Sequence, residues 1–126
     1  MQSKPADIDV AVETPEVTIR CTQWGEMILE TGTIRQTMDV APLFKGLPDD
    51  KCQCPHWGYI FKGEMTFNYG DRSETYTAGN VYYAAPGHTP VLGEGLEYVE
   101  FSPPELYNQT MEVAAKNLEA MMAASH

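Results

Sequence analysis

The segment 51–63, KCQCPHWGYIFKG, places Cys52, Cys54 and His56 at every second position ahead of an apolar run. Alternate side chains of an extended strand point to the same face, so a strand here would gather these three side chains. Thiolate sulfur and imidazole nitrogen are ligands that zinc favours, and that nickel, cobalt or iron use in other settings. The segment could therefore hold a metal ion, close a disulfide, or be an ordinary strand of small residues.

The cysteines alone leave these alternatives open. The chain has three of them, Cys21, Cys52 and Cys54, and an odd number does not suit a closed disulfide framework. A bridge between Cys52 and Cys54 would close a very small ring, which an extended backbone accommodates poorly. Without a metal, both cysteines would be small buried hydrophobes beside a core histidine, His56, or a pair of redox-responsive thiols.

Few other residues could complete a metal site. The chain has three histidines, His56, His88 and the terminal His126, to which we assign no role. His88 lies in APGHTP, just after a tight turn at the end of a predicted strand. By elimination, His88 is the expected partner of His56, and Asp50, in the preceding loop, is a weaker candidate ligand.

Most of the chain consists of short β-like runs separated by Gly, Pro and Asp. The segment EMTFNYGDRSETYT predicts a hairpin, and NVYYAA and LEYVEF predict further strands. We therefore predict a flexible arm over residues 1–14 and a β-barrel over residues 15–103. Residues 104–124 differ, because apolar side chains recur there at helical spacing after two prolines. The helical stripe comprises Leu106, Met111, Ala114, Leu118 and Met121.

Composition narrows the function classes. The 126 residues suffice for one domain, and the net charge of −10 excludes a nucleic-acid role, because phosphate binding requires Lys and Arg. An anionic membrane surface is excluded for the same reason, and no apolar run is long enough to span a bilayer. The N-terminal segment has no apolar centre of the kind a secretory signal needs, so we expect a cytoplasmic protein.

The segment from Asp50 to Phe101 resembles the cupin superfamily. The sequence HWGYIFKG, from His56 to Gly63, is similar to the family pattern Glu-x-x-Tyr-Val-Leu-x-Gly. The segment 79–87 is similar to the family's Gly-Asp-…-Pro-x-Gly, with the proline shifted to Pro86. The C-x-C-P-H-W-G-Y stretch further resembles a small single-domain cupin subgroup.

The resemblance implies a double-stranded β-helix, or jelly roll, with a metal site whose ligands have changed. His56 falls where the family has its glutamate, while Cys52 and Asp50 fall at the two histidines of the first motif. The family's later histidine falls at Pro90, two residues after His88. The oxygenase and isomerase chemistry of cupins with three histidines and a carboxylate therefore does not transfer. The implied metal ligands are Cys52, His56 and His88, with Cys54 as fourth ligand or near neighbour, and zinc is the first candidate ion.

Other polar groups could line the mouth of such a barrel. Tyr82 or Tyr83, Tyr98 and Glu100 are candidates for proton transfer, although tyrosines more often pack with the hydroxyl at the rim and Glu100 would more often face solvent. Trp57 should face away from the site by strand alternation. We predict a metal-binding cupin with a pocket for a small polar molecule, which forms a homodimer. Two alternatives stay open: a non-catalytic cupin with a structural metal site, and a redox-responsive module that uses Cys52 and Cys54.

Overall fold

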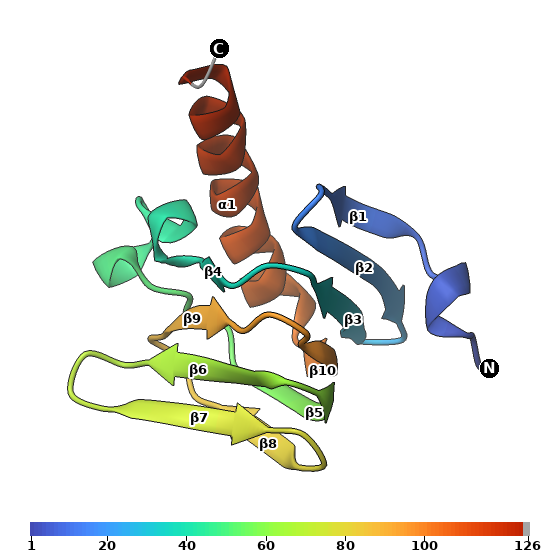
Figure 1. Cartoon of the computed structure of the whole chain (residues 1–126). Helices are drawn as coiled ribbons and strands as arrows, with labels where there is room; N and C mark the ends of the chain where they lie inside the picture. Colours follow the sequence, from blue (N-terminus) through green and yellow to red (C-terminus); the bar gives the residue numbers. More distant parts are fainter. Residues whose placement is uncertain (125–126) are drawn as a thin grey trace.

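Two antiparallel sheets and one long helix make up the chain in a computed structural model, which describes residues 1–124 (Figure 1). The six-stranded sheet has the order β1-β2-β3-β10-β5-β8, and the four-stranded sheet has the order β4-β9-β6-β7. The first sheet comprises β1 (Val10–Glu13), β2 (Val17–Trp24), β3 (Met27–Ile34), β10 (Glu97–Ser102), β5 (His56–Lys62) and β8 (Val81–Ala84). The second comprises β4 (Met38–Asp39), β9 (Thr89–Leu92), β6 (Glu64–Asn68) and β7 (Ser73–Thr77). This arrangement confirms the predicted jelly roll.

Turn residues separate the strands as the sequence predicted. The β6–β7 hairpin pairs Asn68 with Ser73 across a turn in which Gly70 has a φ of 97°. Only glycine adopts this backbone conformation without strain. Of three short 3₁₀ turns, η1 (Pro5–Asp7) precedes β1, and η2 (Ala41–Phe44) and η3 (Pro48–Asp50) connect β4 to β5.

The N-terminal segment corrects one prediction. Residues 10–13, which were expected to belong to a flexible arm, form β1 and pair with β2 through Val10 opposite Arg20 and Glu13 opposite Thr18. The Arg20 guanidinium also donates to the carbonyl of Ile8 at 2.8 Å, which holds the chain ahead of β1. The alternation of β1 is too short to separate it from a polar arm by sequence alone.

The helix α1 (Pro104–Ala124) spans the same residues as the helix expected from the sequence. Its buried residues are Tyr107, Thr110 and Ala114. The predicted apolar stripe of the helix is wrong at both ends, because Leu106 and Met121 are exposed. Within residues 1–124, no helix is long and apolar enough to cross a membrane. His126, to which no role was assigned, lies outside the described residues.

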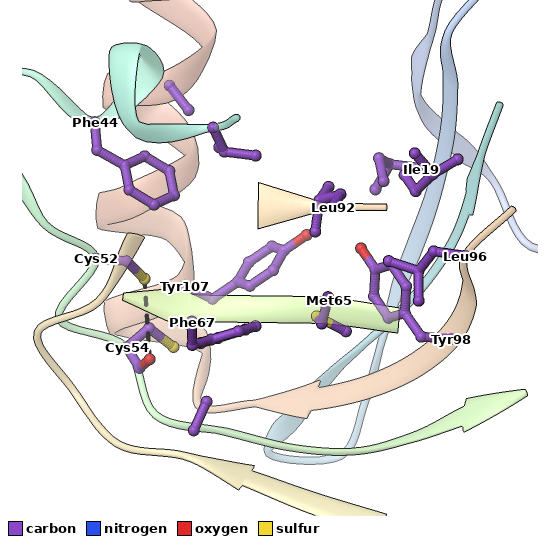
Figure 2. Packing of buried hydrophobic residues seen from close by; sticks show 14 of the residues in the cluster. Ile19, Phe44, Cys52, Cys54, Met65, Phe67, Leu92, Leu96, Tyr98 and Tyr107 are labelled. Carbon is purple, nitrogen blue, oxygen red and sulfur yellow. Dashed lines mark hydrogen bonds between the residues drawn. The ribbon is translucent and has the colours of Figure 1, made fainter. Parts of the chain in front are cut away.

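The core lies between the two sheets and α1. Figure 2 shows Met65 and Phe67 of β6, Leu92 of β9 and Tyr107 of α1 around a common interior. Cys52 and Cys54 belong to the same buried cluster. The interior therefore combines ordinary apolar packing with the side chains that the sequence singled out for chemistry.

Candidate metal centre and the cavity beside it

Cys52, His56 and His88 form a group in which the potential ligand atoms all lie within 4.8 Å of one another. Three neighbouring segments position them. Cys52 pairs with His88 in an isolated antiparallel bridge, where the Cys52 amide donates to the His88 carbonyl at 2.9 Å. His56 begins β5, and its ring lies 5.0 Å from the ring of His88.

Hydrogen bonds at the far side of each ring orient both histidines. Nδ1 of His88 donates to the carbonyl of Ala85 at 2.6 Å, which leaves Nε2 with its lone pair. Nδ1 of His56 lies 2.7 Å from Ser102 Oγ and 3.3 Å from a carboxylate oxygen of Glu100. Nε2 of His56 faces the Cys52 thiol at 3.7 Å. Metal-binding histidines are commonly oriented in this way by a carbonyl or a carboxylate on the second ring nitrogen.

Burial keeps the three groups uncharged while no ion is bound. It lowers the pKa of His56 to about 4 and that of His88 to about 4. Burial also raises the pKa of the Cys52 thiol to about 11. A bound cation reverses this preference, because it favours the thiolate and the neutral imidazole. The donor set therefore suits a borderline-soft divalent ion such as zinc.

Cys54 lies outside this three-residue group. The alternation expected from the sequence fails here, because Cys52 to Pro55 precede β5 and the strand begins only at His56. The Cys54 thiol instead approaches the carbonyls of Pro55 at 3.4 Å and Pro103 at 3.8 Å. Asp50 is exposed, and its carboxylate accepts from the Gly46 amide at 3.0 Å.

The thiols do not have the properties of a reactive redox pair. Burial raises the pKa of Cys54 to about 12, above the already raised value of Cys52. Reactive thiols have a depressed pKa and partial exposure, whereas both of these cysteines are buried. This observation argues against the redox alternative.

Two carboxylates lie side by side next to the metal group. Glu30 on β3 and Glu100 on β10 are register partners, and both are buried. Burial raises the pKa of each to about 7, and for Glu30 the neighbouring charge of Glu100 adds to the effect. Glu100 was expected to face solvent more often than not, and the structure corrects this. Glu30 was not identified from the sequence.

Tyrosine hydroxyls satisfy these carboxylates. Tyr98 and Tyr107 donate to the two oxygens of Glu30 at 2.6 and 2.7 Å, and Tyr82 donates to Glu100 at 2.7 Å. Figure 2 shows Tyr98 and Tyr107 reaching into the interior from opposite sides. The tyrosines are therefore buried hydrogen-bond donors rather than rim residues, and the carboxylates are fully paired.

Two glycines make room for the tyrosines. Gly32 lies opposite Tyr98, and Gly58 lies opposite Tyr82. A Cβ at Gly32 would lie 2.6 Å from Tyr98 Cζ, and a Cβ at Gly58 would lie 2.5 Å from the Tyr82 hydroxyl. A glycine inside a strand commonly marks such a close approach. Each tyrosine ring thus lies across a glycine on the neighbouring strand and delivers its hydroxyl to a glutamate.

A cavity of about 560 Å³ extends from the metal group toward α1 and β1. Cys52, His56 and His88 line it together with Glu30 and Glu100. Most of its remaining surface is apolar, and the apolar lining includes Val17, Ile19, Val40, Leu43, Phe44, Met65, Phe67, Leu92, Met111, Ala114 and Leu118. A ligand in this cavity could therefore reach an ion held by the three residues.

Solved structures share the fold of this chain. The polyketide cyclase RemF from Streptomyces resistomycificus is 13% identical, with a TM-score of 0.58 over 83% of this chain and 80% of that one. An RmlC-like cupin from Shewanella frigidimarina is 14% identical, with a TM-score of 0.56 over 81% of this chain and 88% of that one. A putative ethanolamine utilization protein from Salmonella typhimurium is 9% identical, with a TM-score of 0.52 over 70% and 69%.

These likenesses define the fold. The chain is a small cupin-type β-barrel with one C-terminal helix, as the sequence resemblance implied. No protein-family model and no curated protein matches the sequence. Identities below 15% carry the fold and leave the ligand set to be argued from the residues of this chain.

Proposed function

We propose that this cupin-type barrel binds one divalent transition ion, with zinc as the first candidate, and a small molecule beside it. The observation that carries the proposal is the orientation of the two histidines. The His88 ring donates its Nδ1 proton to a carbonyl, and the Nδ1 of His56 lies beside Glu100 and Ser102. Both Nε2 atoms are thereby left as ligands for an ion near the Cys52 thiol.

The number of ligands favours a working site over a structural one. Structural zinc sites are closed by four protein ligands, whereas catalytic sites have three and keep an open position. The described residues supply Cys52, His56 and His88, and all three line the cavity. When bound, the ion would supply Lewis-acid polarisation of a ligand oxygen, and Glu100 would hold the orientation of His56. The reducing cytoplasm that we propose as its location would keep Cys52 as a thiol.

Elemental analysis of the purified protein tests this proposal. We expect about one transition ion per chain, lost in Cys52→Ser and His56→Ala. Cys54→Ser is the matched control, because its thiol lies two residues away and outside the ligand group. Retention of the ion in Cys52→Ser, or its loss in Cys54→Ser, would contradict the ligand assignment. The absence of any ion from freshly prepared protein would overturn the metal proposal itself.

We also propose that two copies associate through the outer face of the six-stranded sheet. The register places Trp57 between Phe101 and Tyr83, and Tyr59 between Val99 and Val81. The side chains of Trp57, Tyr83 and Phe101 are exposed, at 46%, 50% and 38% respectively. Aromatic residues are enriched at protein interfaces, and such a patch suits a self-complementary contact with a second copy.

A further inference from the structure

The cavity beside the metal group is polar at one end and apolar over the rest of its wall. This division indicates what kind of ligand would fit it. One end holds the polar cluster formed by Cys52, His56, His88 and the two buried glutamates. The rest of the wall is formed by aliphatic, aromatic and methionine side chains from both sheets and α1. A ligand that filled this space would bury most of its surface against apolar atoms, which disfavours the small polar molecule expected from the sequence.

The charge of the lining restricts the ligand further. Four glutamates line the cavity, Glu13, Glu30, Glu100 and Glu119, and none of the lining residues within the described chain is Lys or Arg. An anionic ligand would therefore enter without a side-chain cation to pair with. Burial of an unpaired charge is strongly unfavourable.

A bound ion offsets this restriction only in part. A divalent cation held by one thiolate and two neutral imidazoles has a formal charge of +1, and two acidic side chains, Glu30 and Glu100, lie beside it. No lysine or arginine of the described lining would donate a hydrogen bond to a carboxylate or a phosphate at this end of the cavity.

The paired carboxylates also disfavour a cationic ligand. Both oxygens of Glu30 already accept from tyrosines, and Glu100 accepts from Tyr82 and lies beside His56. An ammonium group would have to compete with these hydrogen bonds for the carboxylate oxygens. An oxygen ligand with no net charge needs no such rearrangement, because it can coordinate an ion at the position that the protein leaves open.

The volume sets the size of the ligand. A cavity of roughly 150 Å³ accommodates benzene, so about 560 Å³ has room for a compound of two or three rings. We infer that the cavity takes an uncharged, mainly apolar compound of this size, with a hydroxyl or carbonyl oxygen that reaches the group formed by Cys52, His56 and His88. The inference rests on the proposed function for the ion that this oxygen would meet.

Three probes of similar size and different charge test the inference: 2-naphthol, 2-naphthoate and 2-naphthylmethylamine. Their dissociation constants for the full-length protein are measured at pH 7.5 by isothermal titration calorimetry. We expect 2-naphthol to bind at least tenfold more tightly than either charged probe. Equal or tighter binding of 2-naphthoate or of the amine would overturn the assignment of an uncharged ligand.

Substitutions on α1 test whether 2-naphthol binds in this cavity. Ala114 is buried and lines the cavity, so Ala114→Phe should weaken 2-naphthol binding at least tenfold. Ala120→Phe is the matched control, because it makes the same change at an exposed position of the same helix. Leu118→Trp, which fills the cavity from a half-buried position, replaces Ala114→Phe if that variant does not fold. Undiminished binding in the folded cavity variant would overturn the location.

Metal content, measured on the same samples, separates this inference from the proposed function. If 2-naphthol binds in the cavity of protein that holds no ion, the metal proposal fails and the ligand class is supported. If protein that holds an ion binds none of the naphthalene probes, the ligand class is overturned and the metal proposal stands.

Discussion

Strands β5 and β10 present opposite chemistry on their two faces. The inner face carries His56, Tyr98 and Glu100, which are buried, whereas the outer face carries the exposed rings of Trp57 and Phe101. Side chains that form hydrogen bonds thus lie inside and exposed aromatic rings lie outside, the reverse of a simple core. The inner face is stable because each buried group has a partner, and within the described residues no buried side-chain nitrogen or oxygen lacks one.

The comparison teaches that tolerance to change should differ between the two faces. A polar group inside the barrel depends on the position of a specific neighbour, so a small alteration leaves something unpaired or displaced. A ring on the outer face touches mainly solvent and its immediate neighbours, so even a large truncation should leave the single chain folded.

The largest loss of stability on the inner face should come from Gly58→Ala. The added Cβ would lie 2.5 Å from the Tyr82 hydroxyl and 2.5 Å from the backbone carbonyl of Val99, and the backbone cannot move aside cheaply. We expect the free energy of unfolding, measured by urea denaturation, to fall by about 3 kcal/mol. Phe61→Ala, a larger change at an exposed position of the same strand, should alter it by about 0.5 kcal/mol or less. A greater loss in Phe61→Ala would contradict the comparison.

Glu30→Gln should have a nearly equal effect on stability, seen as a change in how the free energy of unfolding depends on pH. The pKa of Glu30 is raised from 4.5 to about 7 on folding, mainly by burial. Between these two pH values the folded state therefore keeps a proton on Glu30 that the unfolded state loses. The contribution of Glu30 to the free energy of unfolding is full below pH 4.5 and is lost as the pH rises through 7. Glutamine cannot ionise and does not lose this contribution. The free energy of unfolding of the variant should therefore rise relative to that of the native protein by about 3 kcal/mol between pH 4.5 and 7.5.

The measurement is the difference in the free energy of unfolding between the two metal-free proteins across that range. His56 and His88 act with the opposite sign, because their pKa values fall from 6.5 to about 4 and their contribution is lost as pH falls. They are present in both proteins, and His88 cancels in the difference. The charge of Glu30 raises the pKa of His56, but with a folded-state pKa of about 4 this histidine is mostly neutral in the folded state above pH 4.5, so its remaining contribution to the difference is small. Glu26→Gln, the same substitution at an exposed position, is the matched control. A flat difference for Glu30→Gln would show that Glu30 is not held protonated.

The alternation of side chains along β10 and β3 could have predicted that Glu100 and Glu30 lie on the inner face. Tyr98, Glu100 and Ser102 share one face of β10, and this parity places Glu100 inside. The same argument, applied to Ile28, Glu30 and Gly32 of β3, places Glu30 inside. The signal was present, but a glutamate inside a barrel contradicts the usual exposure of carboxylates.

Other features could not be predicted from sequence spacing. The jelly roll followed from short strands, turn glycines and the cupin resemblance. The grouping of Cys52 with His56 and His88 followed from the same resemblance, with elimination of the other histidines. The orientation of Cys54 did not follow, because Pro55 interrupts the extended segment just before β5 and removes the assumed alternation. The tyrosine partners of Glu30 come from β10 and α1, and only the folded topology brings them together.

A smaller effect is expected for Tyr82→Phe, with Tyr83→Phe as the matched control on the neighbouring residue. Tyr82 is buried and donates to Glu100, whereas the Tyr83 side chain is half exposed on the outer face. Loss of the inner hydroxyl should lower the free energy of unfolding by about 1–2 kcal/mol, because it leaves a buried carboxylate short of a donor. The control should change by about 0.5 kcal/mol or less. Equal effects would contradict the assigned difference between the faces.

The smallest effect on the folded chain, and the largest on its association, should come from the outer face. Trp57→Ser combined with Tyr83→Ser removes two adjacent rings whose centroids lie 5.3 Å apart. If the aromatic face joins two copies, sedimentation should show a dimer for the native protein and a monomer for the double variant, with metal content unchanged. The inner-face variant Tyr82→Phe should remain dimeric, because its hydroxyl points into the barrel. A native monomer, or a double variant that stays dimeric, would remove the outer face as the interface and leave its exposed rings without a partner.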